Sequence, residues 1–230
     1  MKKIINIMAA AALICIAASC EKTPKGPTDF SGGCEAVDLG LSVKWASYNV
    51  GAQNIDGYGF YFAWGETKEK ENYSWAKKGD YKWGVFDGND NPKRGMTKYT
   101  AELEGGDGLK TLQSKDDPAI ANWGTKWRTP TFDEIKELLD ETKCEWTWDE
   151  ARKGYIVKGR ATGNSIFLPV AGDRHNSNLE GVGVVGNYWS ASVYESYPNN
   201  AYSLYFSSIS LQWAYRYRLD GYTVRAVTEY

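Results

Sequence analysis

The stretch Tyr188–Val227, YWSASVYESYPNNAYSLYFSSISLQWAYRYRLDGYTVRAV, decides the fold that we predict. It contains eight of the 16 tyrosines, two tryptophans and no lysine. Tyrosine with serine and asparagine is typical of binding surfaces, because this set combines stiff contact area with adaptable hydrogen bonds. Aromatic residues also favour β-strands. A period of two across residues 201–207 predicts one strand face with Tyr202, Leu204 and Phe206 and another with Ser203, Tyr205 and Ser207. We therefore expect Leu204 and Phe206 in the core and Tyr205 at the surface.

The N-terminus has the pattern of an export signal. Lys2 and Lys3 precede the apolar run Ile4–Ala18, which is short for a membrane span, and Ala17-Ala18-Ser19-Cys20 resembles a lipobox. We predict a lipoprotein signal peptide at residues 1–19 and lipidation of Cys20, with an ordinary secretory signal as the alternative. No other apolar run approaches the length of a membrane helix, so lipid alone would anchor the chain.

The composition beyond the signal limits the partners. Residues 20–33 contain two prolines and three glycines and are expected to form a flexible tether, followed by a single domain over residues 34–230. Residues 1–19 hold two of the 27 basic residues and none of the 29 acidic ones, so the remaining chain has a net charge of −4. No basic patch stands out, so nucleic acid is not an expected partner. The predicted location is the outer membrane, at the cell surface or on its periplasmic side.

Two cysteines, Cys34 and Cys144, remain once Cys15 is removed with the signal and Cys20 is lipidated. In an exported protein these two either form a disulfide or stay as free thiols, and the sequence leaves both possibilities open.

Local signals predict the strands of the domain. Ala36–Val50 alternates around a turn, as a pair of hairpin-like strands does, and Gly59–Trp64 is apolar on both faces, as a buried strand is. Residues 66–118 show no strand pattern, and Asp87–Pro92 within them has the composition of a turn rather than of a calcium loop, since the closing glutamate is missing. Residues 154–158, 165–169 and 222–227 are predicted as further strands, the last of them central or near-central in its sheet.

Two short helices are also expected. Asp117 can cap a helix that begins at Pro118 and ends before Gly124, and Thr131 with Glu134 forms a capping box for a helix over residues 132–139. Short strands, two short helices and long connections together indicate the α+β class.

Many short motifs resemble, in the same order, the Fibrobacter succinogenes major paralogous domain, a family common in exported lipoproteins of Bacteroidetes. The motifs are Val37-Asp38-Leu39-Gly40-Leu41, Trp45-Ala46, Asn49-Val50-Gly51-Ala52, Phe62-Ala63-Trp64-Gly65-Glu66-Thr67, Ala121-Asn122-Trp123-Gly124, Trp127-Arg128-Thr129-Pro130-Thr131, Ile166-Phe167-Leu168-Pro169, Tyr188-Trp189-Ser190 and Val224-Arg225-Ala226-Val227. The helix start and the terminal strand are also similar to the C-type-lectin-like fold. This resemblance implies an α+β domain with a small twisted antiparallel sheet, two short helices, long loops and an exposed C-terminal face, and it implies no activity.

Catalytic and metal-binding patterns are missing from the sequence. His175 is the only histidine and has no nucleophile motif beside it, and one histidine with two separate cysteines does not make a usual zinc site. An oxidase like the formylglycine-generating enzymes would need reactive cysteines in the C-terminal half, where Cys144 is the last. We predict a protein that is not an enzyme and uses no cofactor or metal. A hydrolase of unknown substrate is the enzymatic alternative.

The C-terminal stretch predicts a ligand-binding surface, for a surface protein or a glycan, because tyrosine and arginine dominate binding hot spots. Calcium-dependent lectin motifs do not occur, so sugar binding would not require calcium. The predicted binding residues are Tyr194, Tyr197, Asn199, Asn200, Tyr205, Gln212, Tyr215, Arg216, Tyr217 and Arg218. The alternative role is a structural or tip subunit of a surface assembly such as a fimbria. We expect Arg128 and Arg225 to be structural, tying carbonyl or carboxylate groups together.

Overall fold

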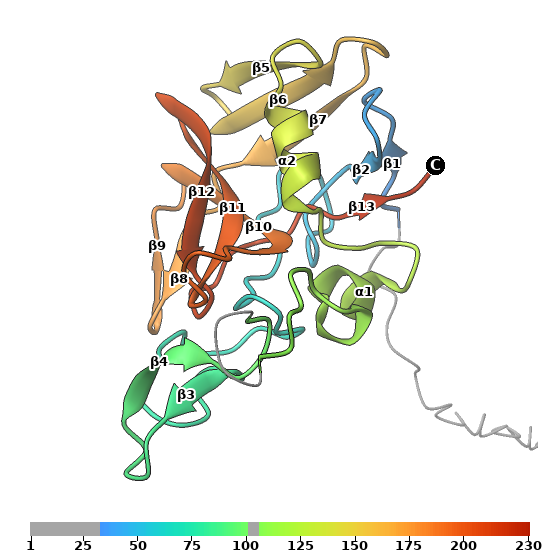
Figure 1. The fold of residues 1–230 in the computed structure, drawn as a ribbon. Coiled ribbons are helices and arrows are strands. Elements are labelled where there is room, and N and C mark those ends of the chain that lie inside the picture. The colour runs from blue at the N-terminus through green and yellow to red at the C-terminus, as the bar shows by residue number, and fades with distance from the viewer. Residues whose placement is uncertain (1–32, 101–105) are drawn as a thin grey trace, which may run out of the picture.

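The computed structural model describes residues 33–100 and 106–230 (Figure 1). Small antiparallel sheets and two α-helices make up this part of the chain, which confirms the α+β class. The predicted signal peptide, the predicted lipidation site Cys20 and residues 20–32 of the predicted tether lie outside the described residues. The elements are β1 (Ala36–Val37), β2 (Lys44–Ala46), β3 (Gly84–Phe86), β4 (Pro92–Met96), a 3₁₀ turn (Ser114–Asp116), α1 (Pro118–Trp123), α2 (Phe132–Leu139), β5 (Cys144–Asp149), β6 (Gly154–Gly159), β7 (Ser165–Pro169), β8 (Asp173–His175), β9 (Asn178–Glu180), β10 (Val185–Val193), β11 (Asn200–Ser207), β12 (Ser210–Tyr217) and β13 (Val227–Thr228).

Three sheets of three strands surround α2. Their strand orders are β10-β11-β12, β5-β6-β7 and β1-β2-β13, and two further hairpins, β3-β4 and β8-β9, complete the fold. Figure 1 shows α2 between the first and the last of these sheets, and α2 contacts all three strands of β10-β11-β12. Neither described helix has the length and the apolar character that crossing a bilayer requires.

Both helices form where the capping signals predicted them. The Asp117 carboxylate accepts hydrogen bonds from the backbone N–H of Ala119 at 2.8 Å and of Ile120 at 3.3 Å, and Pro118 occupies the first position of α1. At α2, the Thr131 hydroxyl accepts from Glu134 N at 3.3 Å and the Glu134 carboxylate accepts from Thr131 N at 2.7 Å, which completes the capping box. Local sequence alone therefore fixes both helix starts.

The strand predictions are confirmed in part. The N-terminal pair forms β1 and β2, and residues 154–158 and 165–169 form β6 and β7. Gly59–Trp64 is not a strand, although Tyr61 to Gly65 are buried, because a single bridge joins Phe62 to Tyr222. Residues 222–227 are likewise buried, but only Val227–Thr228 forms β13, at the edge of its sheet. The backbone of this segment bonds several different segments in turn, so no continuous ladder develops.

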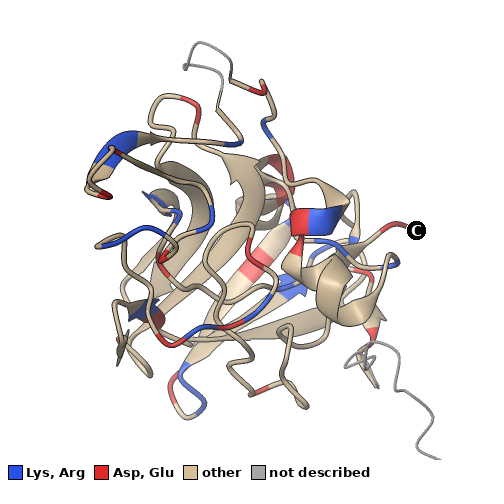
Figure 2. Ribbon diagram, turned by 90° about the horizontal axis from the view of Figure 1, so that it is seen from below, with Lys and Arg blue, Asp and Glu red and all other residues tan. Residues whose placement is uncertain are grey.

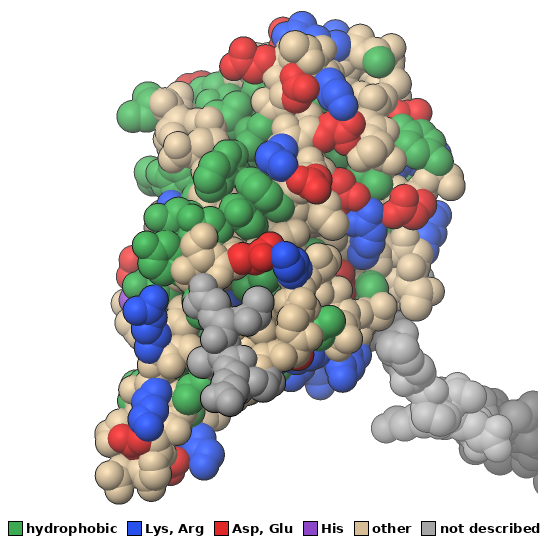
Figure 3. Space-filling model, viewed as in Figure 1, with side chains coloured by type: hydrophobic (Ala, Val, Ile, Leu, Met, Phe, Trp, Pro, Cys, Tyr) green, Lys and Arg blue, Asp and Glu red, His purple; other side chains and the backbone are tan. Residues whose placement is uncertain are grey.

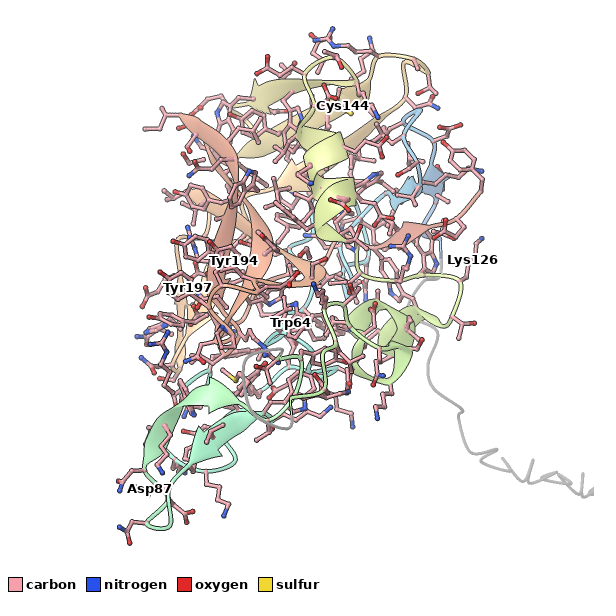
Figure 4. The ribbon with its side chains drawn as sticks, viewed as in Figure 1. Trp64, Asp87, Lys126, Cys144, Tyr194 and Tyr197 are labelled. Carbon is pink, nitrogen blue, oxygen red and sulfur yellow. The ribbon has the colours of Figure 1, made fainter. Side chains whose placement is uncertain are left out.

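The β3-β4 hairpin, together with β5, lies where no strand was predicted. The hairpin turn confirms the prediction that Asp87–Pro92 forms a turn. The Asp87 carboxylate accepts hydrogen bonds from Asn89 N at 2.8 Å and from Asn91 N at 2.9 Å. Asp87 lies near the tip of this hairpin, far from the three larger sheets (Figure 4). The hairpin therefore projects from the body of the fold.

Two hydrophobic clusters form the core. One contains Trp64, Trp83, Tyr99 and Trp189, and the other contains Trp45, Leu138, Leu204 and Phe206. Leu204 and Phe206 are 2 % and 0 % exposed, as the alternation of β11 predicted. Neighbours such as Tyr188 and Trp189 belong to different clusters, so β10 separates the two parts of the core.

Arg225 and Arg128 are structural, as expected. Arg225 is 1 % exposed and donates to Asn49 Oδ1 at 2.8 Å and to the carbonyls of Ala46, Ser47 and Phe167. Burial lowers the pKa of Arg225 to about 10, so the guanidinium remains charged at neutral pH. Arg128 binds the carboxylates of Glu134 and Glu229.

The possible disulfide between Cys34 and Cys144 does not form in the structure, where both thiols are free. Cys144 is buried among the residues of the second cluster at the start of β5, whereas Cys34 packs against the first cluster, with Sγ 3.6 Å from the Ser47 hydroxyl. The two thiols therefore belong to different parts of the core, with Cys144 at the upper end of the view in Figure 4.

Candidate binding site

Strands β11 and β12 and helix α2 carry a surface of aromatic rings. Alternation along the two strands sends every second side chain to the side of the sheet on which α2 packs. Phe132, at the start of α2, stacks on Tyr202 with ring centroids 3.7 Å apart, and Trp213 meets the Phe132 ring edge-on at 5.3 Å. We call this surface the aromatic face, and it consists of Phe132, Tyr194, Tyr197, Tyr202, Trp213, Tyr215 and Tyr217. Hydrophobic side chains gather over these elements in Figure 3.

Three tyrosines of the aromatic face form one stack. Tyr194 lies parallel to Tyr215 with centroids 4.3 Å apart, and it stacks on Tyr197 at 5.7 Å with an angle of 17° between the rings. Figure 4 shows Tyr194 and Tyr197 close together. Tyr197 is 50 % exposed and Tyr215 is 43 % exposed, so both still present ring surface to solvent. Because the rings hold one another in place, little side-chain freedom would be lost on binding.

A cavity of about 300 Å³ opens at one end of the aromatic face. It lies where the β4 strand meets the β10–β11 loop and the end of β12, and its lining is Arg94, Tyr197, Pro198, Asn199, Asn200 and Tyr217. Asn199 Oδ1 accepts from Gly95 N at 3.1 Å, which joins the loop to β4. Within the described residues, the side chains of Asn200 and Arg94 make no hydrogen bond. The cavity thus combines two aromatic rings with an amide and a guanidinium that can bind polar groups.

Arg218 is not an exposed anchor, and the prediction for this residue is wrong. Its side chain is 0 % exposed and lies among aromatic rings, with the guanidinium 4.5 Å from the Trp64 ring centroid and 5.3 Å from that of Trp83. Nη1 donates to the carbonyls of Pro198 at 3.0 Å and Lys98 at 3.1 Å. Arg218 follows the last residue of β12, so the strand alternation no longer determines its direction. Arg218 instead bonds, from inside the core, the carbonyl of Pro198, which lines the cavity.

Three other predicted residues lie on the opposite face of the sheet. The register places Tyr205, Gln212 and Arg216 on the side away from the aromatic face, and the Arg216 guanidinium lies 5.3 Å from the Tyr205 ring centroid. The structure therefore brings together Tyr194, Tyr197, Asn199, Asn200, Tyr215 and Tyr217. It places Tyr205, Gln212 and Arg216 on the other face of the sheet and the Arg218 side chain in the core. The period of two in the strands accounts for Tyr205, Gln212 and Arg216, whereas Arg218 lies past the end of β12 and is buried by the packing around it.

The single histidine lies beside two carboxylates, Asp220 and Asp173. His175 Nδ1 is 3.0 Å from Asp220 Oδ1, and Asp173 Oδ2 accepts from the Asn187 side chain at 2.8 Å. The hydrogen bond with Asp220 raises the pKa of His175, and burial raises the pKa of Asp220 to about 6. Among the described residues, no serine, threonine or cysteine side chain hydrogen-bonds His175, and no three histidine, cysteine or carboxylate side chains cluster as metal ligands.

Positions of basic and acidic residues are both spread along the ribbon of the described residues in Figure 2. Arg94, on the strand that borders the cavity, is a cation in the cavity lining beside Tyr197 and Tyr217. The candidate site therefore presents mainly aromatic and amide groups.

The sequence analysis missed Phe132, Trp213 and Arg94. Trp213 could have been found, because it alternates with Tyr215 and Tyr217 at the period of a strand. Phe132 was recognised only as a helical residue. Arg94 had no local signal, because the β3-β4 hairpin is placed beside β11 by contacts between residues far apart in the sequence.

Comparison of the sequence with protein-family models and curated proteins, and of the fold with solved structures, finds no match.

Proposed function

We propose that this chain is a lipoprotein of the bacterial outer membrane whose domain, residues 34–230, binds a glycan and performs no chemistry on it. The observation that carries this proposal is the cavity of about 300 Å³ bordered by Tyr197 and Tyr217 at the end of the aromatic face. Its volume is at the lower end for ligand sites, which suits a small polar ring more than a protein loop.

The chemistry of the lining fits a sugar. The electron-rich face of a tyrosine ring attracts the C–H groups on one side of a sugar ring, and this contact is apolar enough to exclude water. The side-chain amide of Asn200 and the Arg94 guanidinium, both in the lining, can then bind hydroxyl or carboxylate groups at the sugar edge. Binding through these groups needs no metal.

The order of the motifs supports membership of the Fibrobacter succinogenes major paralogous domain family and a C-type-lectin-like arrangement, which we include in the proposal. The lipobox-like Ala17-Ala18-Ser19-Cys20 supports the lipid anchor. An anchored domain with an exposed aromatic face suits display at the cell surface.

A glycan array probed with the purified protein tests the proposal. Tyr197→Ala and Tyr217→Ala are each expected to weaken binding about tenfold or more, equivalent to about 1.4 kcal/mol. Tyr205→Ala is the matched control, because Tyr205 lies on the opposite face. Its affinity should be unchanged.

Two results contradict the proposal. One is glycan binding that survives in the Tyr197→Ala/Tyr217→Ala double variant with an unchanged melting temperature. The other is an array without binding, together with specific capture of a surface protein that depends on the same two tyrosines, which would make the ligand a protein.

A further inference from the structure

Strand β12 is the outer strand of the sheet β10-β11-β12 (Figure 1). It pairs with β11 from Ser207↔Ser210 to Asn200↔Tyr217 without a register shift. An outer strand directs every second backbone N–H and C=O group away from its sheet.

The hydrogen bond from Arg218 N to Asn199 O shows which residues of β12 turn outward. Hydrogen-bonded pairs alternate along an antiparallel ladder, so Arg216, Ala214 and Gln212 bond β11. The outward residues are then Leu211, Trp213, Tyr215 and Tyr217. Among the described residues, their outward groups accept only from Arg216 Nη1, to Tyr215 O, and from Asp220 N, to Tyr217 O.

Nothing in β12 protects this edge. Natural edge strands carry lysine, proline, inward charges or a bulge, which prevent pairing with another strand. β12, SLQWAYRY, has no lysine, proline, acidic residue or bulge, and its one charge, Arg216, lies over Tyr205 on the opposite face. Trp213, Tyr215 and Tyr217 are 45 %, 43 % and 55 % exposed. The open hydrogen-bonding groups therefore belong to the same residues as the exposed rings.

We propose that two copies of this chain pair through β12, antiparallel around Ala214. This register places Trp213 opposite Tyr215 of the second copy, and Leu211 opposite Tyr217. In both pairs the outward N–H and C=O groups of one copy face those of the other. The strand is thus complementary to itself, a property that pairing with a different protein would not require. Aromatic pairs across strands add to the stability of such a ladder.

Charge does not oppose this pairing. Arg216 would lie opposite Gln212 of the second copy, and the two arginines would be four residues apart along the ladder, about 13 Å. This separation exceeds the Debye length of about 8 Å at physiological ionic strength. The two-fold axis is perpendicular to the sheet, so the aromatic faces of both copies lie on the same side and form one continuous surface.

Sedimentation velocity over a range of protein concentrations tests the pairing. The wild-type protein is expected to sediment as a dimer, and Trp213→Pro as a monomer, because proline removes an outward N–H that β11 does not use. Trp213→Ala is the matched control, since it also loses the indole but keeps the N–H, and it should still dimerise. A wild-type monomer at all concentrations, or a Trp213→Pro dimer as stable as the wild type, would overturn the proposal.

A cross-link gives a second test that does not depend on a folded proline variant. Non-hydrogen-bonded pairs bring two Cα atoms within about 4.5 Å, which is within disulfide reach. In a Cys34→Ser background, Ala214→Cys at the two-fold axis should oxidise to a covalent dimer. Ile209→Cys, which is 95 % exposed but distant from the axis, should remain monomeric. Equal cross-linking of both variants, or none of Ala214→Cys, contradicts the register.

Discussion

Replacing Arg218 by alanine is expected to lower the free energy of unfolding by about 4 kcal/mol. The carbonyls of Pro198 and Lys98 would each lose the donor that Arg218 supplies at 3.0 and 3.1 Å. A buried acceptor without a donor costs about 1–3 kcal/mol, so the two together cost roughly 2–6 kcal/mol. Removal of the side chain that packs against Trp64 and Trp83 adds a cavity, whereas the loss of a buried charge offsets part of the total.

Urea unfolding followed by tryptophan fluorescence measures this effect. With a denaturant dependence of about 2 kcal/mol per molar, the expected loss moves the midpoint by about 2 M. Arg218→Met should lose less than Arg218→Ala, because methionine keeps the apolar contact with the rings and leaves a smaller cavity. Arg94→Ala, at an exposed arginine, is the control and should stay within about 0.5 kcal/mol of the wild type. An Arg218→Ala midpoint equal to that of the wild type would refute the reasoning.

Three further predictions concern single groups. Asp220→Asn should lower the pKa of His175, seen as an NMR titration shifted to lower pH, because the imidazolium loses the carboxylate that stabilises it; an unchanged titration contradicts this. Alkylation of the native protein, mapped by mass spectrometry, should label Cys34 and spare Cys144, since Cys144 is 1 % exposed and burial raises its pKa to about 11. Thr131→Ala should cost about 1 kcal/mol in urea unfolding through loss of the α2 cap, and no loss would mean that the capping box is redundant.

The parts of the fold that were predictable have local causes. Asp117 and Pro118 determine the start of α1 through bonds to the next few residues, and the alternation around Leu204 determines which side of β11 is buried. The Gly59–Trp64 segment has the composition of a strand but forms no continuous hydrogen-bond ladder with another strand. Its partner, Tyr222, is 160 residues further along the chain from Phe62, and a period in the sequence carries no information about such a partner.

The candidate site likewise contains some residues whose positions were predictable from local sequence and others whose positions depend on distant contacts. Tyr215 and Tyr217 share a face because they belong to one strand, so the tyrosine surface was predictable. Arg216 and Arg218 are two positions apart, so strand alternation would send both side chains to the same face. Only Arg218, however, is enclosed by aromatic rings of residues 64–99. That enclosure depends on how a separate segment packs, which no pattern around Arg218 indicates.

The segment 221–227 has a consequence for how the protein is made. Its backbone bonds Ala46, Val50, Phe62, Arg128 and Arg174, so the N-terminal half acquires its last hydrogen-bond partners from the end of the domain. A chain that leaves a secretion channel N-terminus first therefore cannot complete its fold until residue 227 has emerged. For the lipoprotein that we propose, export would then proceed on an unfolded polypeptide, and a product that stopped short of this segment would remain a substrate for proteases.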